Sequence, residues 1–194
     1  MGTRGAFGVI IGEKEKLAYN HFDSYPEGKG IEVLQWLRDA DMKAVRRLSA
    51  KARVIDPETK PTAEDKKRLK PYTDLGVSKQ SEDDWYCLTR SSQGDMSAML
   101  DSGYVLDAGD FPLDSLFCEW AYIIDLDTNG FEVYRGFQEK DHKAGRFGSR
   151  ASRNGWKPEY KGQKYFAPIA LAKSWPLDAL PSDEDFLAEF GRED

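Results

Sequence analysis

The sequence has little cysteine and little histidine, and both shortages limit its chemistry. Among 194 residues there are two cysteines and two histidines. Cys87 and Cys118 lie in the apolar stretches WYCL and LFCEW, which predicts two buried free thiols and neither a disulfide nor a metal pair. His21 and His142, with scattered carboxylates, lack the spacing of a zinc site. We therefore expect no metal and no cofactor.

Long apolar runs are also absent. No stretch reaches the length that crosses a membrane, and the N-terminus lacks the apolar core of a signal peptide. The start MGTRGA has Ala6 where N-myristoylation needs Ser or Thr. Phosphate-binding glycine loops and the G-x-S-x-G nucleophile motif are missing as well. The expectation is a cytoplasmic protein (host cell cytoplasm if a phage encodes it) without a membrane partner.

Composition nevertheless indicates a folded protein. The chain is 40% hydrophobic and 12% aromatic, whereas disordered chains are poor in aromatic residues. Its net charge of −6 disfavours wholesale nucleic-acid coating. The length fits one domain over residues 1–194, and the sequence leaves the oligomeric state open.

Two β-hairpins are expected. The runs Ala6–Ile11 and Leu17–Phe22 flank a polar turn near the N-terminus. Later, the segment Glu119–Phe137 holds two β-rich runs around Asn129 and Gly130, a favoured tight-turn pair. Because hairpins pair antiparallel, the sheet should be mainly antiparallel.

Helical periodicity begins at Ile31, and the residues Asp39 and Asp41 break it into two pieces. A strand over residues 165–173 contains Pro168, which favours an edge position or a bulge. The pattern predicts an α+β fold, a mainly antiparallel sheet with β-hairpins covered by helices. Further helices are expected over residues 62–70, 81–90 and 95–100, and after the N-cap Ser182.

A basic, Gly-rich loop is expected over residues 138–164. Between positions 140 and 164 the segment has many Lys and Arg residues, few Asp and Glu residues, and interleaved aromatic residues. Cationic side chains attract phosphates and aromatic rings can stack on bases, so this combination favours nucleic-acid binding. A solvated loop that balances the acidic remainder is the alternative. The candidate nucleic-acid-binding residues are Lys143, Arg146, Arg150, Arg153 and Trp156.

The run YNHFDSYP after the first hairpin packs many hydrogen-bonding side chains into eight residues. It suits either a structural polar network or a ligand site. Arg4 is expected to pair with Asp23 across the hairpin, and the Gly28–Gly30 triplet before a helix could bind an anion through free N–H groups. The candidate ligand-binding residues are Arg4, Tyr19, Asn20, His21, Asp23, Tyr25 and Lys29.

Three motifs, MGTRG, YNHFDSYPEG and LFCEWAYIIDLDTNGFEVYRGF, resemble a family of uncharacterised proteins from bacteriophages and bacteria. The resemblance covers most of the chain and is weakest over residues 60–80. The family implies no activity that can be carried over. It does favour a phage accessory protein, and such proteins often bind a host protein or counter a defence system.

A weaker resemblance, to N-terminal nucleophile hydrolases, rests on an opening strand followed by a polar Asn/Asp-containing strand. Their chemistry needs an N-terminal Cys, Ser or Thr. Removal of Met1 exposes Gly2, so Thr3 would serve only after a second cleavage.

The sequence thus predicts a non-enzymatic phage protein that binds a host macromolecule or an anionic ligand, in host takeover or anti-defence. A small hydrolase or amidase of N-terminal-nucleophile type is one alternative. Nucleic-acid binding through the 140–164 loop is another.

Overall fold

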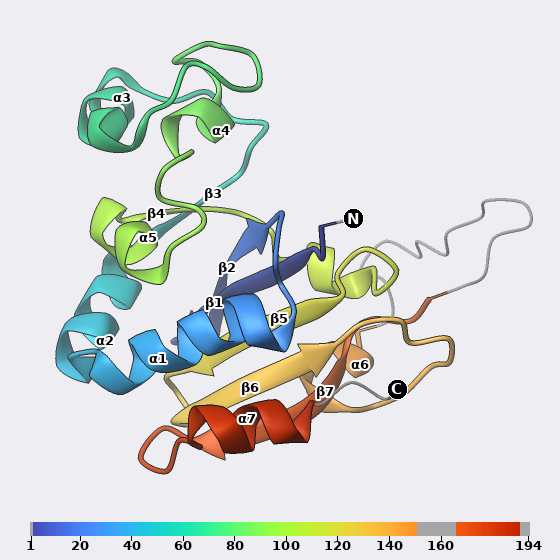
Figure 1. Ribbon diagram of the computed structural model, residues 1–194. Helices are drawn as coiled ribbons and strands as arrows, with labels where there is room; N and C mark the ends of the chain where they lie inside the picture. Colours follow the sequence, from blue (N-terminus) through green and yellow to red (C-terminus); the bar gives the residue numbers. More distant parts are fainter. Residues whose placement is uncertain (1, 151–165, 191–194) are drawn as a thin grey trace, which may run out of the picture.

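The computed structural model describes residues 2–150 and 166–190, and a five-stranded mixed sheet forms its centre (Figure 1). The strand order is β2-β1-β5-β6-β7. Within this sheet β1 and β5 pair in parallel, and the other neighbours are antiparallel. The predicted α+β class is confirmed. The strands are β1 (Gly5–Ile11), β2 (Lys14–Asn20), β5 (Trp120–Asp125), β6 (Gly130–Arg135) and β7 (Ala170–Pro176).

Seven α-helices and a small second sheet complete the described chain. A π-helical turn, Pro26–Gly30, leads directly into α1. Two short strands, β3 (Arg53–Ile55) and β4 (Tyr104–Leu106), pair in parallel. The helices are α1 (Ile31–Asp39), α2 (Met42–Lys51), α3 (Ala63–Leu69), α4 (Trp85–Leu88), α5 (Met96–Ser102), α6 (Gly145–Gly148) and α7 (Asp183–Glu189).

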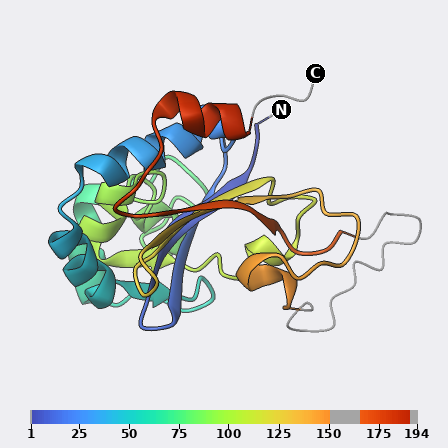
Figure 2. The same cartoon turned by 90° about the horizontal axis from the view of Figure 1, so that it is seen from below.

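Apolar side chains alternate along the central strands and create a core on each face of the sheet. On one face Phe7 and Phe131 contribute to a cluster that includes Leu34 of α1 and Phe186 of α7. The other face is covered near Phe147 of α6. Seen from below, α1 and α7 lie on one side of the sheet and α6 on the opposite side (Figure 2). Helices therefore cover the sheet, as predicted.

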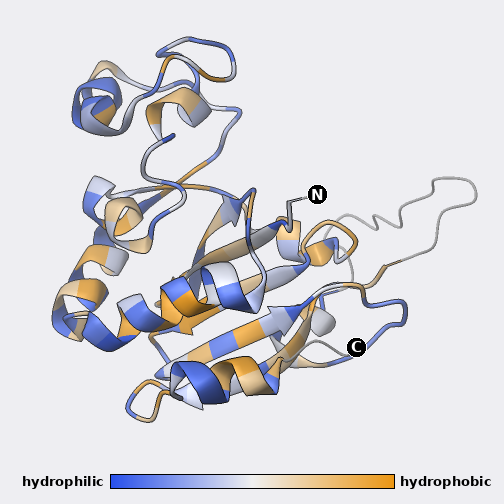
Figure 3. Cartoon of the chain, viewed as in Figure 1, coloured by the Kyte–Doolittle hydropathy of each residue, from blue (hydrophilic) through white to orange (hydrophobic). Residues whose placement is uncertain are grey.

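A small lobe stands beyond the edge of the sheet and contains α3, α4 and β3 (Figure 1). It has its own apolar cluster, which includes Leu69, Trp85 and Tyr104, while α3 itself is largely hydrophilic (Figure 3). Its helix α4 and the turn after it face the end of β2.

Asp65 ties the lobe together. Its side chain accepts hydrogen bonds from the Tyr104 hydroxyl and the Arg53 guanidinium, both at 2.7 Å. It also closes a capping box with Thr62 at the start of α3. Burial opposes ionisation, but these hydrogen bonds outweigh it and lower the pKa of Asp65 to about 2.

Both predicted hairpins are confirmed, and the second has a longer turn than expected. Asp125 pairs with Gly130, which leaves four residues in the loop. The Asp125 carboxylate accepts hydrogen bonds from the backbone N–H groups of Asp127 and Thr128 at 2.9 and 3.0 Å. Asn129 then adopts a left-handed φ of 57°, which asparagine tolerates better than most residues.

Several boundaries differ from the prediction, and two of the differences have a clear physical reason. The helix expected over residues 81–90 is only α4, because the chain makes turns until Asp84 accepts a hydrogen bond from the Tyr86 backbone as N-cap. The last strand begins at Ala170 and not before Pro168, since proline cannot donate to a sheet. It does lie at an edge of the sheet, as Pro168 suggested.

Cys87 and Cys118 are free and buried, as expected. Within residues 2–150 and 166–190 no helix has the length and apolar character needed to span a bilayer.

Candidate functional site

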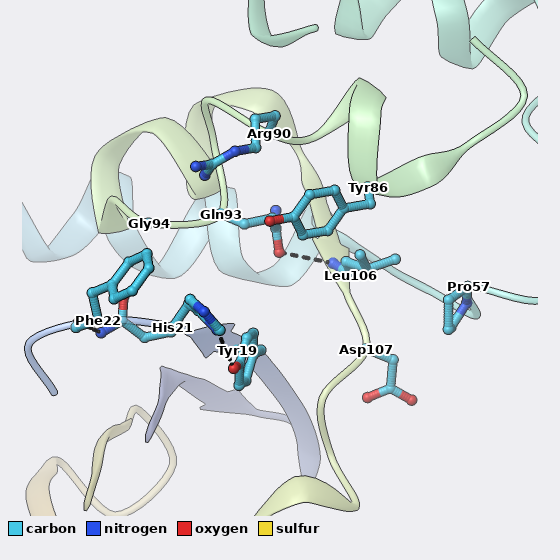
Figure 4. Close-up of a pocket in the computed structure, with 11 residues that line it drawn as sticks. Tyr19, His21, Phe22, Pro57, Tyr86, Arg90, Gln93, Gly94, Leu106 and Asp107 are labelled. Atoms are coloured by element: carbon cyan, nitrogen blue, oxygen red, sulfur yellow. Dashed lines mark hydrogen bonds between the residues drawn. The ribbon is translucent and has the colours of Figure 1, made fainter. Parts of the chain in front are cut away.

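A pocket of about 240 Å³ lies between the end of β2 and the small lobe. Aromatic side chains from both sides line it, with a single arginine among them (Figure 4). The lining residues are Tyr19, Asn20, His21, Phe22, Pro57, Tyr86, Arg90, Gln93, Gly94, Leu106 and Asp107.

The end of β2 forms one wall. The strand stops at Asn20 because its side-chain amide turns back to the Phe22 carbonyl and to the Ser24 hydroxyl, the latter at 2.7 Å. Asp23 then takes a left-handed φ of 53°. The chain bends away and leaves Phe22 exposed at 59%, with its ring edge-on to His21 at a centroid distance of 4.3 Å.

Tyr19 and His21 form a hydrogen-bonded pair in this wall. The Tyr19 hydroxyl lies 2.6 Å from His21 Nδ1, and the Tyr19 ring packs edge-on against Phe111 at 5.0 Å. Burial raises the pKa of Tyr19, although the charge of Arg4 acts in the opposite direction. The phenol thus keeps its proton at neutral pH and can donate it to Nδ1, which leaves the imidazole proton on Nε2 in that arrangement.

The opposite wall comes from α4 and the turn that follows it. Tyr86 is 43% exposed, and the Arg90 guanidinium lies 5.8 Å from the centre of its ring. Figure 4 shows both side chains across the pocket from Tyr19 and His21. In the described part of the chain Arg90 makes no ion pair, unlike Arg53, Arg146 and Arg150.

Gln93 and Lys29 hold the back of the pocket in place. Gln93 Oε1 accepts a hydrogen bond from the Leu106 backbone at 3.1 Å. The Lys29 ammonium donates to the Gly94 carbonyl and to the Glu32 carboxylate, both at 2.6 Å. These contacts connect the loop before α5 to the start of α1.

Of the predicted ligand-binding residues, Tyr19, Asn20 and His21 line the pocket, whereas Arg4, Asp23, Tyr25 and Lys29 do not. The predicted Arg4–Asp23 ion pair is wrong: the Arg4 guanidinium instead lies over the ring of Phe117 at 4.7 Å. Asp23 cannot present itself to Arg4 as an extended strand would, because its left-handed backbone turns the chain.

The prediction of an anion site at Gly28–Gly30 is also wrong. All three backbone N–H groups already donate within the chain, to the carbonyls of Tyr25 and Asp23. The Lys29 side chain is buried and paired with Glu32. The triplet is a π-helical junction whose donors are used.

The basic segment is partly described. Arg146 is bound by the carboxylates of Asp125 and Glu132 at 2.6 and 2.8 Å. Burial works against its charge, but these acids outweigh that effect and raise the pKa of Arg146. Arg150 forms two hydrogen bonds with the Glu15 carboxylate.

Lys143 is exposed, whereas Arg153 and Trp156 lie outside the described residues. Nucleic-acid binding by this segment stays a prediction, and two of its five candidate residues are engaged in ion pairs within the protein.

The sequence analysis missed Tyr86, Arg90 and Asp107. The first two belong to DDWYCLTR, where a Tyr and an Arg four positions apart would have shared one side of the expected helix. Asp107 follows a short strand, and nothing local singles it out. In the described residues no group of His, Cys, Asp or Glu is placed to hold a metal ion.

Comparisons with protein-family models, curated proteins and solved structures find no match for this chain. The functional argument therefore depends on the pocket itself.

Proposed function

We propose that this is a binding protein whose pocket holds a small anionic ligand with a flat aromatic ring. The observation that carries the proposal is Arg90, an exposed arginine without an ion-pair partner in the described chain, at a pocket walled by aromatic rings. Arg146 and Arg150, by contrast, already form ion pairs with Asp125 and Glu15. Arg90 is therefore available for an external anion.

The ring requirement follows from the walls. Tyr19, His21 and Phe22 line one side and Tyr86 the other, as Figure 4 shows. Aromatic faces bind flat ligand rings by stacking, which contributes about 1–3 kcal/mol for each ring. An aliphatic anion would satisfy Arg90 but would leave these faces in contact with water.

Two further donors can fix the orientation of the ligand. The Tyr86 hydroxyl has no hydrogen-bond partner among the described residues. His21 Nε2 points away from the bond that Nδ1 makes with Tyr19. A few polar groups in an otherwise apolar pocket are typical of small-molecule sites.

This proposal refines one half of the expected function, the anionic ligand. It keeps Tyr19, Asn20 and His21 in the proposed site, because they line the pocket, and adds Tyr86 and Arg90. Phage origin and a role against the host are further proposals that stem from the resemblance alone.

Isothermal titration calorimetry with matched probes tests the proposal. The panel pairs aromatic anions (nucleoside monophosphates, phosphotyrosine and 4-hydroxybenzoate) with counterparts that lack the anionic group (nucleosides, tyrosine amide and 4-hydroxybenzamide) or the ring (inorganic phosphate). At least one aromatic anion should bind more tightly than both of its counterparts.

The substitution Arg90→Gln should lower the affinity for that aromatic anion by about tenfold or more, because a charge-assisted hydrogen bond contributes about 1.5–3 kcal/mol. Arg47→Gln is the matched control, since Arg47 is exposed on α2 and does not line the pocket. The proposal is wrong if no aromatic anion binds, or if both variants bind equally well.

A further inference from the structure

The pocket has a charge at each of two opposite sides. Figure 4 shows Arg90 on one side and Asp107 on the other, with Tyr86 between them. A ligand that fits this arrangement carries its negative group at one end and hydrogen-bond donors at the other. We propose, on the basis of the proposed function above, that the ligand is a guanine nucleoside 5′-monophosphate.

Asp107 is held in position by its own backbone. Its N–H donates to the Ile55 carbonyl at 2.9 Å, which extends the pairing of β3 and β4 by one residue. One carboxylate oxygen accepts a hydrogen bond from the Gly109 N–H at 2.8 Å. Asp107 makes no ion pair in the described chain, so its carboxylate remains available to a ligand.

A carboxylate discriminates among the bases by their donors. Guanine presents two adjacent donors, the ring N1–H and the exocyclic N2 amine, which match the two oxygens of a carboxylate. Adenine and cytosine each present one amine beside a ring-nitrogen acceptor, which repels a carboxylate. Uracil presents one N–H between two carbonyl groups. Asp107 therefore favours guanine.

The phosphate belongs at Arg90. A guanidinium binds phosphate oxygens in a bidentate manner, and Arg90 is the cation among the residues that line the pocket. One arginine balances a monophosphate better than the larger charge of a triphosphate. The exposed Phe22 and Tyr86 flank the pocket and can stack on the base while the ribose and phosphate stay near solvent.

Calorimetry on the full chain tests this inference with GMP, AMP, CMP and UMP as probes. GMP should bind at least tenfold more tightly than the other three. Asp107→Asn should reduce GMP affinity by about tenfold or more, since a charged acceptor is replaced by a neutral one, and should not reduce AMP affinity. The asparagine oxygen can still accept from Gly109 N–H, so the turn is kept.

Arg90→Gln separates the two ends of the ligand. It should lower the affinity for GMP but not the affinity for guanosine, while Asp107→Asn should lower both affinities. Asp178→Asn, at an exposed site outside the pocket, is the control and should change nothing.

The outcomes distinguish this inference from the proposed function. Equal affinities for the four nucleotides, or unchanged GMP affinity in Asp107→Asn, overturn the guanine assignment. Tight binding of 4-hydroxybenzoate or phosphotyrosine without any nucleotide also overturns it, yet leaves the proposed function intact. Absence of binding across the whole panel overturns both.

Discussion

The Tyr19 hydroxyl lies 2.6 Å from His21 Nδ1, at the point where β2 leaves the sheet. Side chains two positions apart on a strand share a face, so the pair could be anticipated from the sequence. We expect the Tyr19 hydroxyl to donate in this contact, and an acceptor at Nδ1 requires the proton on Nε2. The histidine then presents a donor to the pocket.

The substitution Tyr19→Phe removes the hydroxyl and should remove the preference of His21 for this tautomer. In long-range ¹⁵N–¹H NMR spectra at pH 8, His21 of the unmodified protein should be in the Nε2–H form, and the variant should show a mixture of both forms. His142 is an internal control, since its Nδ1 accepts from the Ala144 N–H at 3.1 Å and its Nε2 lies 2.8 Å from the Pro168 carbonyl. An unchanged His21 spectrum in the variant would contradict the assignment.

Acid should weaken the lobe through Asp65. The pKa of this carboxyl is about 2 in the folded protein, below its value of about 3.9 in an unfolded chain. A lowered folded-state pKa means that the unfolded chain takes up protons first as the pH falls. The stabilisation is therefore present above about pH 4 and is lost between about pH 4 and pH 2.

Asp65→Asn should lower the free energy of unfolding at pH 7 by about 2 kcal/mol, because Tyr104 and Arg53 lose a charged acceptor. Urea unfolding at pH 7 and pH 2.5 measures both effects. The variant should lose less stability than the unmodified protein between these two conditions. Asp178→Asn, at an exposed site, should behave like the unmodified protein, and a parallel acid loss in all three would exclude Asp65 as the cause.

Arg146 should matter for stability more than for any external anion. Asp125 and Glu132 surround its guanidinium, and both carboxylates are largely buried. Arg146→Gln leaves these two acids without their cation, which should lower the free energy of unfolding by about 3 kcal/mol.

Lys143→Gln is the matched control in the same segment. Lys143 is exposed, so its loss should change stability by no more than about 0.5 kcal/mol. Urea unfolding measures both variants. If Arg146→Gln is as stable as Lys143→Gln, the ion-pair network does not stabilise the fold, and the nucleic-acid interpretation of this arginine gains support.

The hairpins and most helices could be predicted because their signals are local. Short β-like runs around a polar turn indicate β1 and β2, and the caps Thr62 and Ser182 start α3 and α7 as expected. The parallel pairing of β1 with β5 could not be read in this way, since more than a hundred residues separate them. Such pairing depends on the whole core and not on a local pattern.

The same limit applies to the candidate site. Tyr19, Asn20 and His21 were found because they cluster in one run of the sequence. Arg90 and Asp107 reach the pocket only because the lobe folds over the end of β2. Arg146 and Arg150 were assigned to an external anion because their acidic partners, Asp125, Glu132 and Glu15, lie outside the basic segment, on strands that the fold brings beside it.

The last prediction compares two phenylalanines, one in the core and one at the pocket. Phe186 of α7 is fully buried and stacks on Phe131 at a ring-centroid distance of 6.2 Å. Phe22 is 59% exposed at the pocket. Phe186→Ala should lower the free energy of unfolding by about 3–5 kcal/mol, because it removes buried apolar surface and leaves a cavity.

Phe22→Ala should change that free energy by no more than about 0.5 kcal/mol, yet it should weaken the tightest aromatic anion of the panel by roughly fivefold to a hundredfold, since stacking on one ring contributes about 1–3 kcal/mol. Chemical denaturation and calorimetry on the same two variants measure the two effects. A Phe22 variant that loses stability but keeps its affinity would place this side chain in the fold and not in the site.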